Sequence, residues 1–359
     1  MTRTAPSTAG APSTAGAPAG AEPRRTVRVE LGDRAYPVEI GPGVRHLLAD
    51  VVAGTGASRA VVVSARPREL VPDPGLPWLF VAARDGEEHK TFATVEQLCL
   101  EFARFGLTRH DVVVSCGGGT TTDTVGLAAA LYHRGVAVIH LPTTLLAQVD
   151  ASVGGKTAVN LRAGKNLVGA YWQPRAVLCD TDFLATLPGR EWVNGYGEIA
   201  RCHFIGAGDL RELPVTDQIA ASVARKAEIV AADERDSGLR HLLNYGHTLG
   251  HAVEHVSGFA VRHGEAVGIG TVFAGRLAHA LGRIGERRRD EHLAVVAHYG
   301  LPTALPAGLS AEALIGSMRL DKKALHGLAF VLDGPDGARL VPGVPEGEVR
   351  RLLAGMGAA

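Results

Sequence analysis

The segment 111–141 constrains the fold most, because its pattern combines two apolar strands with a glycine loop and a helix between them. Apolar runs at 111–116 and 136–141 flank the sequence GGGTTTD at 117–123 and a helical pattern near 124–133. Two strands joined through a helix normally lie parallel in one sheet. The segment therefore predicts a strand-helix-strand unit of an α/β domain with parallel strands.

Similar patterns extend this domain toward the N-terminus. A short β-branched run at 60–64 predicts a strand, and a helical stripe over 94–105 is stopped by Gly106. Between 26 and 40, apolar and polar residues alternate on both sides of a Gly-Asp pair. This alternation predicts a half-buried hairpin at the edge of the sheet.

The two ends of the chain differ from this α/β pattern. In the C-terminal half the apolar positions follow helical spacing, for example over 239–256 and 265–281. We therefore predict an α/β domain over 26–187 and a mainly helical domain over 188–359. Residues 1–25 repeat Ala-Pro-Ser-Thr-Ala-Gly and contain no Leu, Ile, Val or Phe, so we expect a disordered tail there.

The composition excludes several classes of partner. Lysine plus arginine and aspartate plus glutamate number 37 each, so no net charge attracts nucleic acid or an anionic membrane. No apolar run approaches the ~18 residues of a membrane-spanning helix. The four cysteines form no CxxC pair and are too few for a disulfide framework, which favours buried thiols in a reducing cytoplasm. We expect a cytoplasmic protein whose anion sites are local.

Two glycine-rich stretches are candidate anion sites. GGGTTTD at 117–123 follows a strand and opens a helix, where free amide groups favour a phosphate or pyrophosphate. Its spacing is not GxGxxG, so a tight turn without a ligand stays an alternative. GGKT at 154–157 lacks the first glycine of the Walker pattern, which excludes a P-loop kinase or ATPase. Lys156 and Lys165 either bind a substrate phosphate or are solvated lysines.

Histidines and one glutamate suggest a metal site. The sequence NYGHTLGH at 244–251 places His247 and His251 four residues apart, on one face if the segment is helical. His263 begins the next predicted helix, and Glu198 lies in GEIAR at 197–201. One glutamate and two histidines leave open positions on zinc, which is typical of a catalytic site. The alternative is that these histidines pack or cap helices.

Taken together, ten motifs resemble the dehydroquinate synthase family of sugar-phosphate cyclases, in the order of that family and from about residue 28 to the end. Within it, the chain is most similar to the aminodehydroquinate synthases that supply aminohydroxybenzoate to ansamycin-type antibiotics. The motifs are GGGTTTD at 117–123, YHRG at 132–135, LPTT at 141–144, QVDASVGGK at 148–156, GKN at 164–166, WQP at 172–174, GEIAR at 197–201, NYGHTLGH at 244–251, RHGE at 262–265 and DKK at 321–323.

The resemblance implies a Rossmann-like domain that holds NAD, a helical domain that holds Zn²⁺ or Co²⁺, and a homodimer. It also implies roles for single residues. The metal ligands are Glu198, His247 and His263. The catalytic groups are His251, Lys156, Asp150, Asn244 and Arg201. The groups that bind substrate phosphate or carboxylate are Asn166, Lys226, Arg240, Lys322, Lys323 and an Arg134 from the partner subunit. The NAD site contains Glu87, Lys90, Gly118, Gly119, Asp123, Thr143, Thr144 and Lys165.

In the family, NAD transiently oxidises a ring hydroxyl, phosphate leaves by elimination, and an aldol addition closes the carbocycle. Lys226 and Arg240 favour a phosphorylated seven-carbon keto acid, since a desolvated carboxylate needs charged partners. Arg201 departs from the lysine that dehydroquinate synthases generally carry there, which indicates an altered, amino-substituted substrate. Arg66 follows a strand at a place where an acidic residue usually contacts the ribose of the cofactor. Either Glu87 contacts the ribose instead and the cofactor is NAD, or Arg66 contacts a 2′-phosphate and the cofactor is NADP.

The sequence leaves one preferred function and three alternatives. The preferred one is aminodehydroquinate synthase, and the first alternative is the 3-dehydroquinate synthase of the shikimate pathway, whose substrate differs in one substituent. The second alternative is a metal-dependent polyol dehydrogenase, which would accumulate NADH. The third is a noncatalytic binding protein, which would tolerate loss of the metal ligands.

Overall fold

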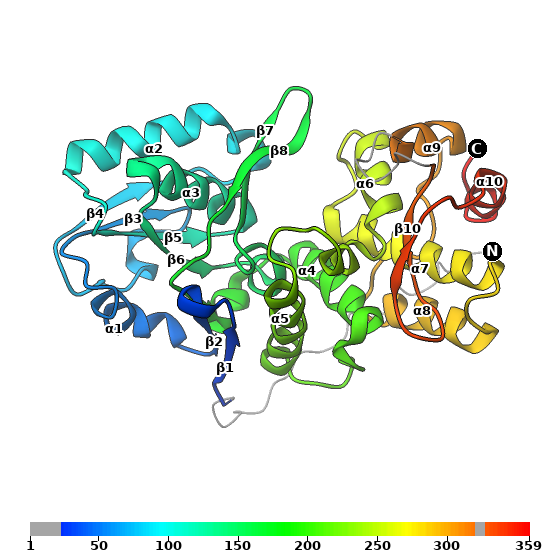
Figure 1. The fold of residues 1–359 in the computed structure, drawn as a ribbon, viewed down its shortest axis with the longest axis horizontal. Coiled ribbons are helices and arrows are strands. Elements are labelled where there is room, and N and C mark those ends of the chain that lie inside the picture. Colours follow the sequence, from blue (N-terminus) through cyan, green and yellow to red (C-terminus); the bar gives the residue numbers. More distant parts are fainter. Residues whose placement is uncertain (1–22, 320–326) are drawn as a thin grey trace, which may run out of the picture.

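A seven-stranded sheet forms one half of the molecule and a group of helices forms the other (Figure 1). The computed structural model describes residues 23–319 and 327–359. The sheet has the order β1-β2-β9-β6-β5-β3-β4, and all its pairs are parallel except β1 with β2. Its strands are β1 Arg25–Val29, β2 Tyr36–Gly41, β3 Ala60–Ser64, β4 Trp78–Ala82, β5 Val112–Gly117, β6 Ala137–Pro142 and β9 Ala176–Asp180.

The central strands are buried on both faces, which explains their continuous apolar sequence. Val61 and Val63 of β3 pack against α2 (Phe92–Phe105) and α3 (Gly119–Leu131), whereas Val62 faces α1 (Leu48–Ala53) on the other side. Figure 1 shows α2 and α3 above the sheet and α1 below it. The predicted α/β domain with parallel strands is therefore confirmed.

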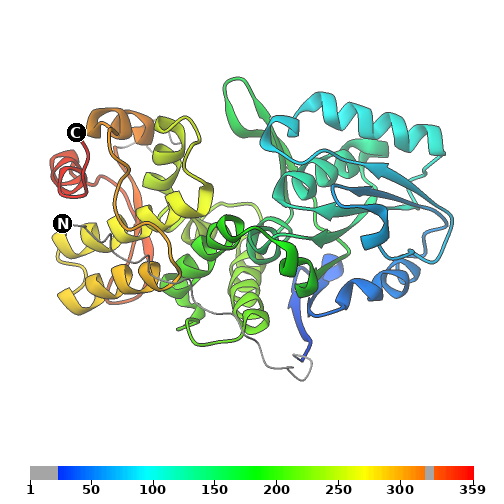
Figure 2. The same cartoon turned by 180° about the vertical axis from the view of Figure 1, so that it is seen from behind.

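The second half of the chain is mainly helical, as predicted. In both views, α4 and α5 lie between the sheet and the remaining helices (Figures 1 and 2). Its helices are α4 Gly189–Cys202, α5 Val215–Ala232, α6 His247–Val256, α7 His263–Ala280, α8 Glu286–His298, α9 Ala311–Arg319 and α10 Glu346–Ala354, and a small ribbon is formed by β10 Phe330–Leu332 and β11 Arg339–Val341.

Most of the predicted elements agree with the structure to within a few residues. The hairpin predicted over 26–40 is β1–β2 at the sheet edge. The helical pattern over 239–256 is instead interrupted, because Leu239–Asn244 is a 3₁₀ segment and Gly246 adopts φ 77° before α6 begins. The division at 187/188 stays a prediction, with α4 beginning at Gly189.

One hairpin that the sequence did not predict projects from the sheet half. Strands β7 (Lys156–Leu161) and β8 (Gly164–Tyr171) pair antiparallel in a separate two-stranded sheet. In Figure 1 they stand at the top of the view, between α3 and the helical half. The lysine-rich stretch that follows the Gly-Gly pair is thus an exposed strand pair rather than a loop.

Candidate functional site

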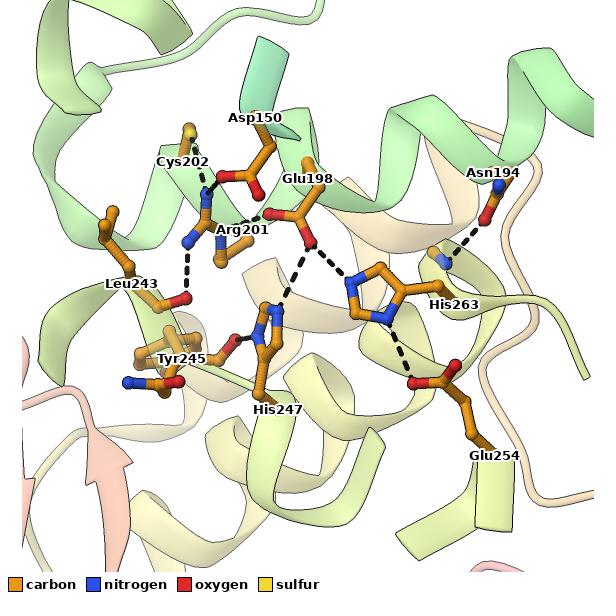
Figure 3. A network of polar contacts seen from close by, with 12 residues as sticks. Asp150, Asn194, Glu198, Arg201, Cys202, Leu243, Tyr245, His247, Glu254 and His263 are labelled. Atoms are coloured by element: carbon orange, nitrogen blue, oxygen red, sulfur yellow. Dashed lines mark hydrogen bonds and ion pairs between the residues drawn. The ribbon is translucent and has the colours of Figure 1, made fainter. Parts of the chain in front are cut away.

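Three helices bring one carboxylate and two imidazoles to a common point. Glu198 comes from α4, His247 from the first residue of α6 and His263 from the first residue of α7 (Figure 3). Glu198 Oε1 lies 3.1 Å from His263 Nε2 and 3.3 Å from His247 Nε2. Their candidate ligand atoms all lie within 4.8 Å of one another, a spacing that suits one ion with bonds of roughly 2.0–2.2 Å.

Glycines at two helix crossings permit this approach. A Cβ on Gly264 would lie 1.8 Å from the backbone oxygen of Asn194, so only glycine lets the start of α7 touch α4. A Cβ on Gly270 would lie 1.9 Å from the oxygen of Gly246, which holds the start of α6 against α7. Because these contacts flank His263 and His247, the glycines set the positions of the candidate ligands.

Hydrogen bonds fix the orientation of both imidazoles. His247 Nδ1 lies 3.0 Å from the carbonyl oxygen of Tyr245, and His263 Nδ1 lies 3.0 Å from Glu254 Oε2. When each Nδ1 donates to its oxygen, the two Nε2 atoms are left as ligands on the side of Glu198. This arrangement of outer acceptors is typical of metal-ligating histidines.

The electrostatics of the cluster favour a cation. Burial lowers the pKa of His263, but the carboxylates of Glu198 and Glu254 outweigh it and raise that pKa to about 10. Burial likewise raises the pKa of Glu198, yet the charges of Arg201 and His247 hold it well below its usual range. The two carboxylates thus stay ionised and hold a proton on His263 at neutral pH, and a divalent metal would displace this proton from Nε2 when it binds.

A buried charge network lies behind Glu198. Arg201 forms an ion pair of 2.7 Å with Glu198 Oε2 and lies 3.3 Å from Asp150 Oδ1. Lys226 Nζ donates to both Oδ1 and the backbone oxygen of Asp150, each at 2.7 Å. Burial alone would raise the pKa of Asp150, but Lys226 and Arg201 lower it, so the carboxylate stays ionised.

The two residues assigned to a substrate carboxylate lie on either side of Gly154. A Cβ there would meet Arg240 Nη2 at 2.9 Å and Lys226 Cε at 3.6 Å. Arg240 donates to the backbone oxygens of Gly154, at 2.7 Å, and of Glu234. The structure therefore brings Lys226 and Arg240 together and buries both.

A second cluster lies at the carboxyl edge of the parallel strands, where α/β proteins bind their ligands. Lys90 Nζ contacts Asp123 Oδ2 at 2.5 Å and Asn166 Oδ1 at 2.6 Å. Glu87 Oε1 accepts from Asn160 Nδ2 at 2.7 Å. Four residues assigned to NAD or phosphate, from three separate segments, thus lie together.

The glycine loop occupies the same edge. Gly118 is the N-cap of α3 and Gly119 its first residue. A Cβ on Gly118 would lie 3.3 Å from the Thr144 methyl group, and Thr143 Oγ1 is buried without a hydrogen-bond partner. The start of α3 and the unpartnered hydroxyl of Thr143 offer donors for a pyrophosphate.

Several residues assigned to the site lie elsewhere or have other partners. Lys156 forms an ion pair of 2.6 Å with Asp236. Four residues of β7, or roughly 13 Å, separate Lys156 from the position on that strand that contacts Asn166. Lys165 Nζ lies 3.6 Å from Glu254 Oε1 and 4.1 Å from the centre of the Phe259 ring. Lys322 and Lys323 lie outside the described residues.

The remaining assigned residues border the metal cluster or lie far from it. The ring of His251 is exposed, 5.3 Å from that of His247 and 6.0 Å from that of His263. Asn244 ends the 3₁₀ segment before α6 and donates to His241. Arg134 is exposed at the C-terminal end of α3, roughly 20 Å of helix from the glycine loop.

Two acidic residues of the site were not found from the sequence. Glu254 orients His263, and Asp236 pairs with Lys156. Glu254 stands seven residues after His247 and three after His251, so helical periodicity could have placed it on the same face. Asp236 adopts φ 62° in the segment between α5 and the 3₁₀ turn, and no spacing rule indicates its contact.

Other expectations concern cysteines, Arg66 and membranes. All four cysteines are free thiols, but Cys99 is only half-buried, so the prediction of buried thiols was wrong for that residue. Cys99 packs only partly against the core that Val95, Leu98 and Phe102 of α2 help to form. Arg66 forms an ion pair with Asp85. Within 23–319 and 327–359, no helix is long and apolar enough to cross a membrane.

The fold and the site define the class of protein. A structure of 2-deoxy-scyllo-inosose synthase complexed with carbaglucose-6-phosphate, NAD⁺ and Co²⁺ matches with a TM-score of 0.84 and 25% identity, over 92% of this chain and 100% of that chain. A structure of 2-epi-5-epi-valiolone synthase from Streptomyces hygroscopicus subsp. jinggangensis 5008, with NAD⁺ and Zn²⁺ bound, matches with a TM-score of 0.76 and 28% identity, over 89% and 96%. The architecture is that of the dehydroquinate synthase-like cyclases.

The sequence comparisons identify the family. Residues 80–194 match the family described as 3-dehydroquinate synthase N-terminal, and residues 195–324 match 3-dehydroquinate synthase C-terminal. A relative from Amycolatopsis mediterranei (strain S699), named "Putative aminodehydroquinate synthase", is 70% identical over 92% of this chain and 94% of its own. A 3-dehydroquinate synthase from Nocardia farcinica (strain IFM 10152) is 41% identical over 93% and 94%. This chain belongs to the 3-dehydroquinate synthase family.

Proposed function

We propose that the protein is an aminodehydroquinate synthase of the cytoplasm. It would convert the amino analogue of 3-deoxy-arabino-heptulosonate 7-phosphate into aminodehydroquinate, with elimination of phosphate and closure of a carbocycle. The observation that carries the proposal is the 70% identity, over 92% of the chain, with a relative of that name, against 41% for a 3-dehydroquinate synthase. Aminodehydroquinate would then serve as a precursor of aminohydroxybenzoate in antibiotic biosynthesis.

The donor sets support a metal ion and NAD as cofactors. Glu198, His247 and His263 would hold Zn²⁺ or Co²⁺, which would lower the pKa of a chelated substrate hydroxyl and so ease its oxidation. The loop of Gly118 and Gly119 would receive the pyrophosphate of NAD. When bound, NAD⁺ supplies a hydride acceptor that is regenerated within each turnover.

The chain's own charged groups suit a phosphorylated keto acid. Lys226 and Arg240, buried beside Gly154, would bind the substrate carboxylate, because a desolvated anion needs charged donors. Asp150 is ionised between Lys226 and Arg201, so it can accept a proton from a hydroxyl. These roles require the substrate to displace part of the internal pairing of Lys226.

A second subunit would complete the phosphate grip. Lys156, Asn166, Lys322 and Lys323 would contact the phosphate and stabilise the charge that leaves with it. Arg134 lies at the far end of α3 from its own glycine loop, so it would serve the site of a partner in a homodimer. His251, exposed beside His247, would hydrogen-bond the substrate and help to transfer protons.

The proposal is tested by steady-state kinetics on both sugar acids. We expect a higher kcat/KM for the amino substrate than for the hydroxy substrate, and phosphate release without net NADH. His247→Ala should abolish phosphate release while His279→Ala, on the outer end of α7, should not. A clear preference for the hydroxy substrate would identify a shikimate-pathway 3-dehydroquinate synthase instead, and net NADH formation would indicate a polyol dehydrogenase.

A further inference from the structure

The Arg201 side chain contacts Cys202 Sγ at 3.9 Å and, in addition, three oxygen groups from different segments. Its Nε pairs with Glu198 Oε2 at 2.7 Å, its Nη1 donates to the backbone oxygen of Leu243, and its Nη2 lies 3.3 Å from Asp150 Oδ1. The side chains of Arg201 and Glu198 are each only 1% exposed. The guanidinium is therefore enclosed by protein and has no face that a substrate could contact directly.

The two oxygens of Glu198 have separate partners. Oε1 faces the Nε2 atoms of His247 and His263, at 3.3 and 3.1 Å, whereas Oε2 faces Arg201. Figure 3 shows Arg201 on the opposite side of the carboxylate from the two imidazoles. Arg201 Nε and Glu198 Oε2 form an ion pair without hydrogen-bond geometry, and this charge contact draws Oε2 toward Arg201 and leaves Oε1 on the side of the metal cluster.

Only an arginine can satisfy this geometry. Its planar guanidinium carries donors in several fixed directions, whereas the lysine ammonium is a single point at the end of a flexible chain. A lysine at this position could pair with one carboxylate but could not hold Glu198, Asp150 and Leu243 together. Contacts behind a metal ligand of this kind typically change metal affinity 10- to 100-fold when they are lost.

We propose that Arg201 is a positioning residue for the metal ligand Glu198, and that one guanidinium ties this ligand to Asp150. The inference rests on the metal assignment in the proposed function. It replaces the direct substrate role that the departure from lysine suggested, because Arg201 acts through Glu198 and not through the substrate. A different residue at position 201 would then alter the geometry of the metal site and only indirectly the binding of substrate.

The test measures binding of Zn²⁺ alone, by competition with a chromogenic chelator, in the full-length protein. Arg201→Lys should weaken Zn²⁺ binding by roughly 10- to 100-fold. Arg225→Lys is the matched control, because Arg225 also pairs at 2.7 Å with a glutamate three residues away, Glu228, and donates to the backbone oxygen of Ile205, but in a more exposed place. The control should change the affinity by less than about twofold.

Two further readouts separate a positioning role from other roles. The visible absorption of the Co²⁺-loaded protein should change in Arg201→Lys and not in Arg225→Lys, since it reports the ligand geometry. Activity lost in Arg201→Lys should return with excess Zn²⁺. Unchanged Zn²⁺ affinity with an unchanged Co²⁺ spectrum, or a loss of activity that excess metal leaves in place, would overturn the inference.

A second variant covers the case in which Arg201→Lys does not fold. Asp150→Asn removes one anchor of the guanidinium without emptying the space, and it should weaken Zn²⁺ binding about threefold, within the range of such contacts. Unchanged Zn²⁺ affinity in Asp150→Asn would contradict the link to Asp150. Failure of the wild-type protein to bind Zn²⁺ at all would instead refute the metal site of the proposed function.

Discussion

Replacement of Gly264 by alanine tests whether the helix crossing sets the metal cluster. The new Cβ would lie 1.8 Å from the backbone oxygen of Asn194, and real Cβ contacts essentially never fall below 3.0 Å. The backbones of α4 and α7 must therefore separate by at least about 1.2 Å at this point, whereas a metal site tolerates about 0.2 Å in its bond lengths. Because Gly264 follows His263 directly, this displacement moves a candidate ligand away from Glu198.

We expect two measurable effects of Gly264→Ala. Overpacking typically costs about 1–3 kcal/mol of folding free energy, and a clash with a backbone atom belongs at the upper end of this range, above the gain of about 1 kcal/mol that alanine brings to a helix. Urea unfolding of the metal-free protein measures the first effect. Chelator competition measures the second, which is a loss of Zn²⁺ affinity.

Gly316→Ala is the matched control, since Gly316 lies inside α9 and nothing surrounds its Cβ position within 4 Å. This variant should be more stable than the wild type by up to about 1 kcal/mol and should bind Zn²⁺ normally. If Gly264→Ala is as stable as Gly316→Ala and binds Zn²⁺ as tightly as the wild type, the close crossing does not position the cluster.

Three further predictions follow from single contacts. Glu254→Gln removes the charged acceptor of His263 and should weaken Zn²⁺ binding by roughly 10-fold or more, as measured by chelator competition; an unchanged affinity would refute its orienting role. Burial lowers the pKa of His140 from 6.5 to about 4, so on acidification this histidine is protonated in the unfolded chain before it is protonated in the folded protein. The neutral His140 therefore contributes fully to stability above pH 6.5, and the free energy of unfolding falls by about 3 kcal/mol as the pH drops to 4. Urea unfolding between pH 7 and 4.5 should show this loss, and His140→Gln should reduce it. Lys90→Met leaves the Asp123 carboxylate without its cation, so it should weaken NAD⁺ binding more than Lys165→Met does, as measured by fluorescence titration. The reverse order would contradict an NAD site at the edge of the sheet.

The local pattern of the sequence determined the elements and their class. Strands such as β3 and β5 are rich in valine because both of their faces are buried, and a strand-helix-strand order normally gives a parallel arrangement. Spacing also indicated the helix that carries His247 and His251, since residues four apart share one face. These features depend on neighbours in the sequence, so the sequence by itself was sufficient.

Only the tertiary structure decided which side chains meet. The contacts of Glu198 with Arg201 on one side and the imidazoles on the other depend on how α4, α6 and α7 cross, and periodicity specifies a buried face but not its partner. The same holds for Glu254, which faces His263 because α6 and α7 pack together. The break before α6 could not be predicted either, because it depends on a contact between helices. Gly246 takes a left-handed conformation and approaches Gly270, which is 24 positions away and is connected to it by no local pattern.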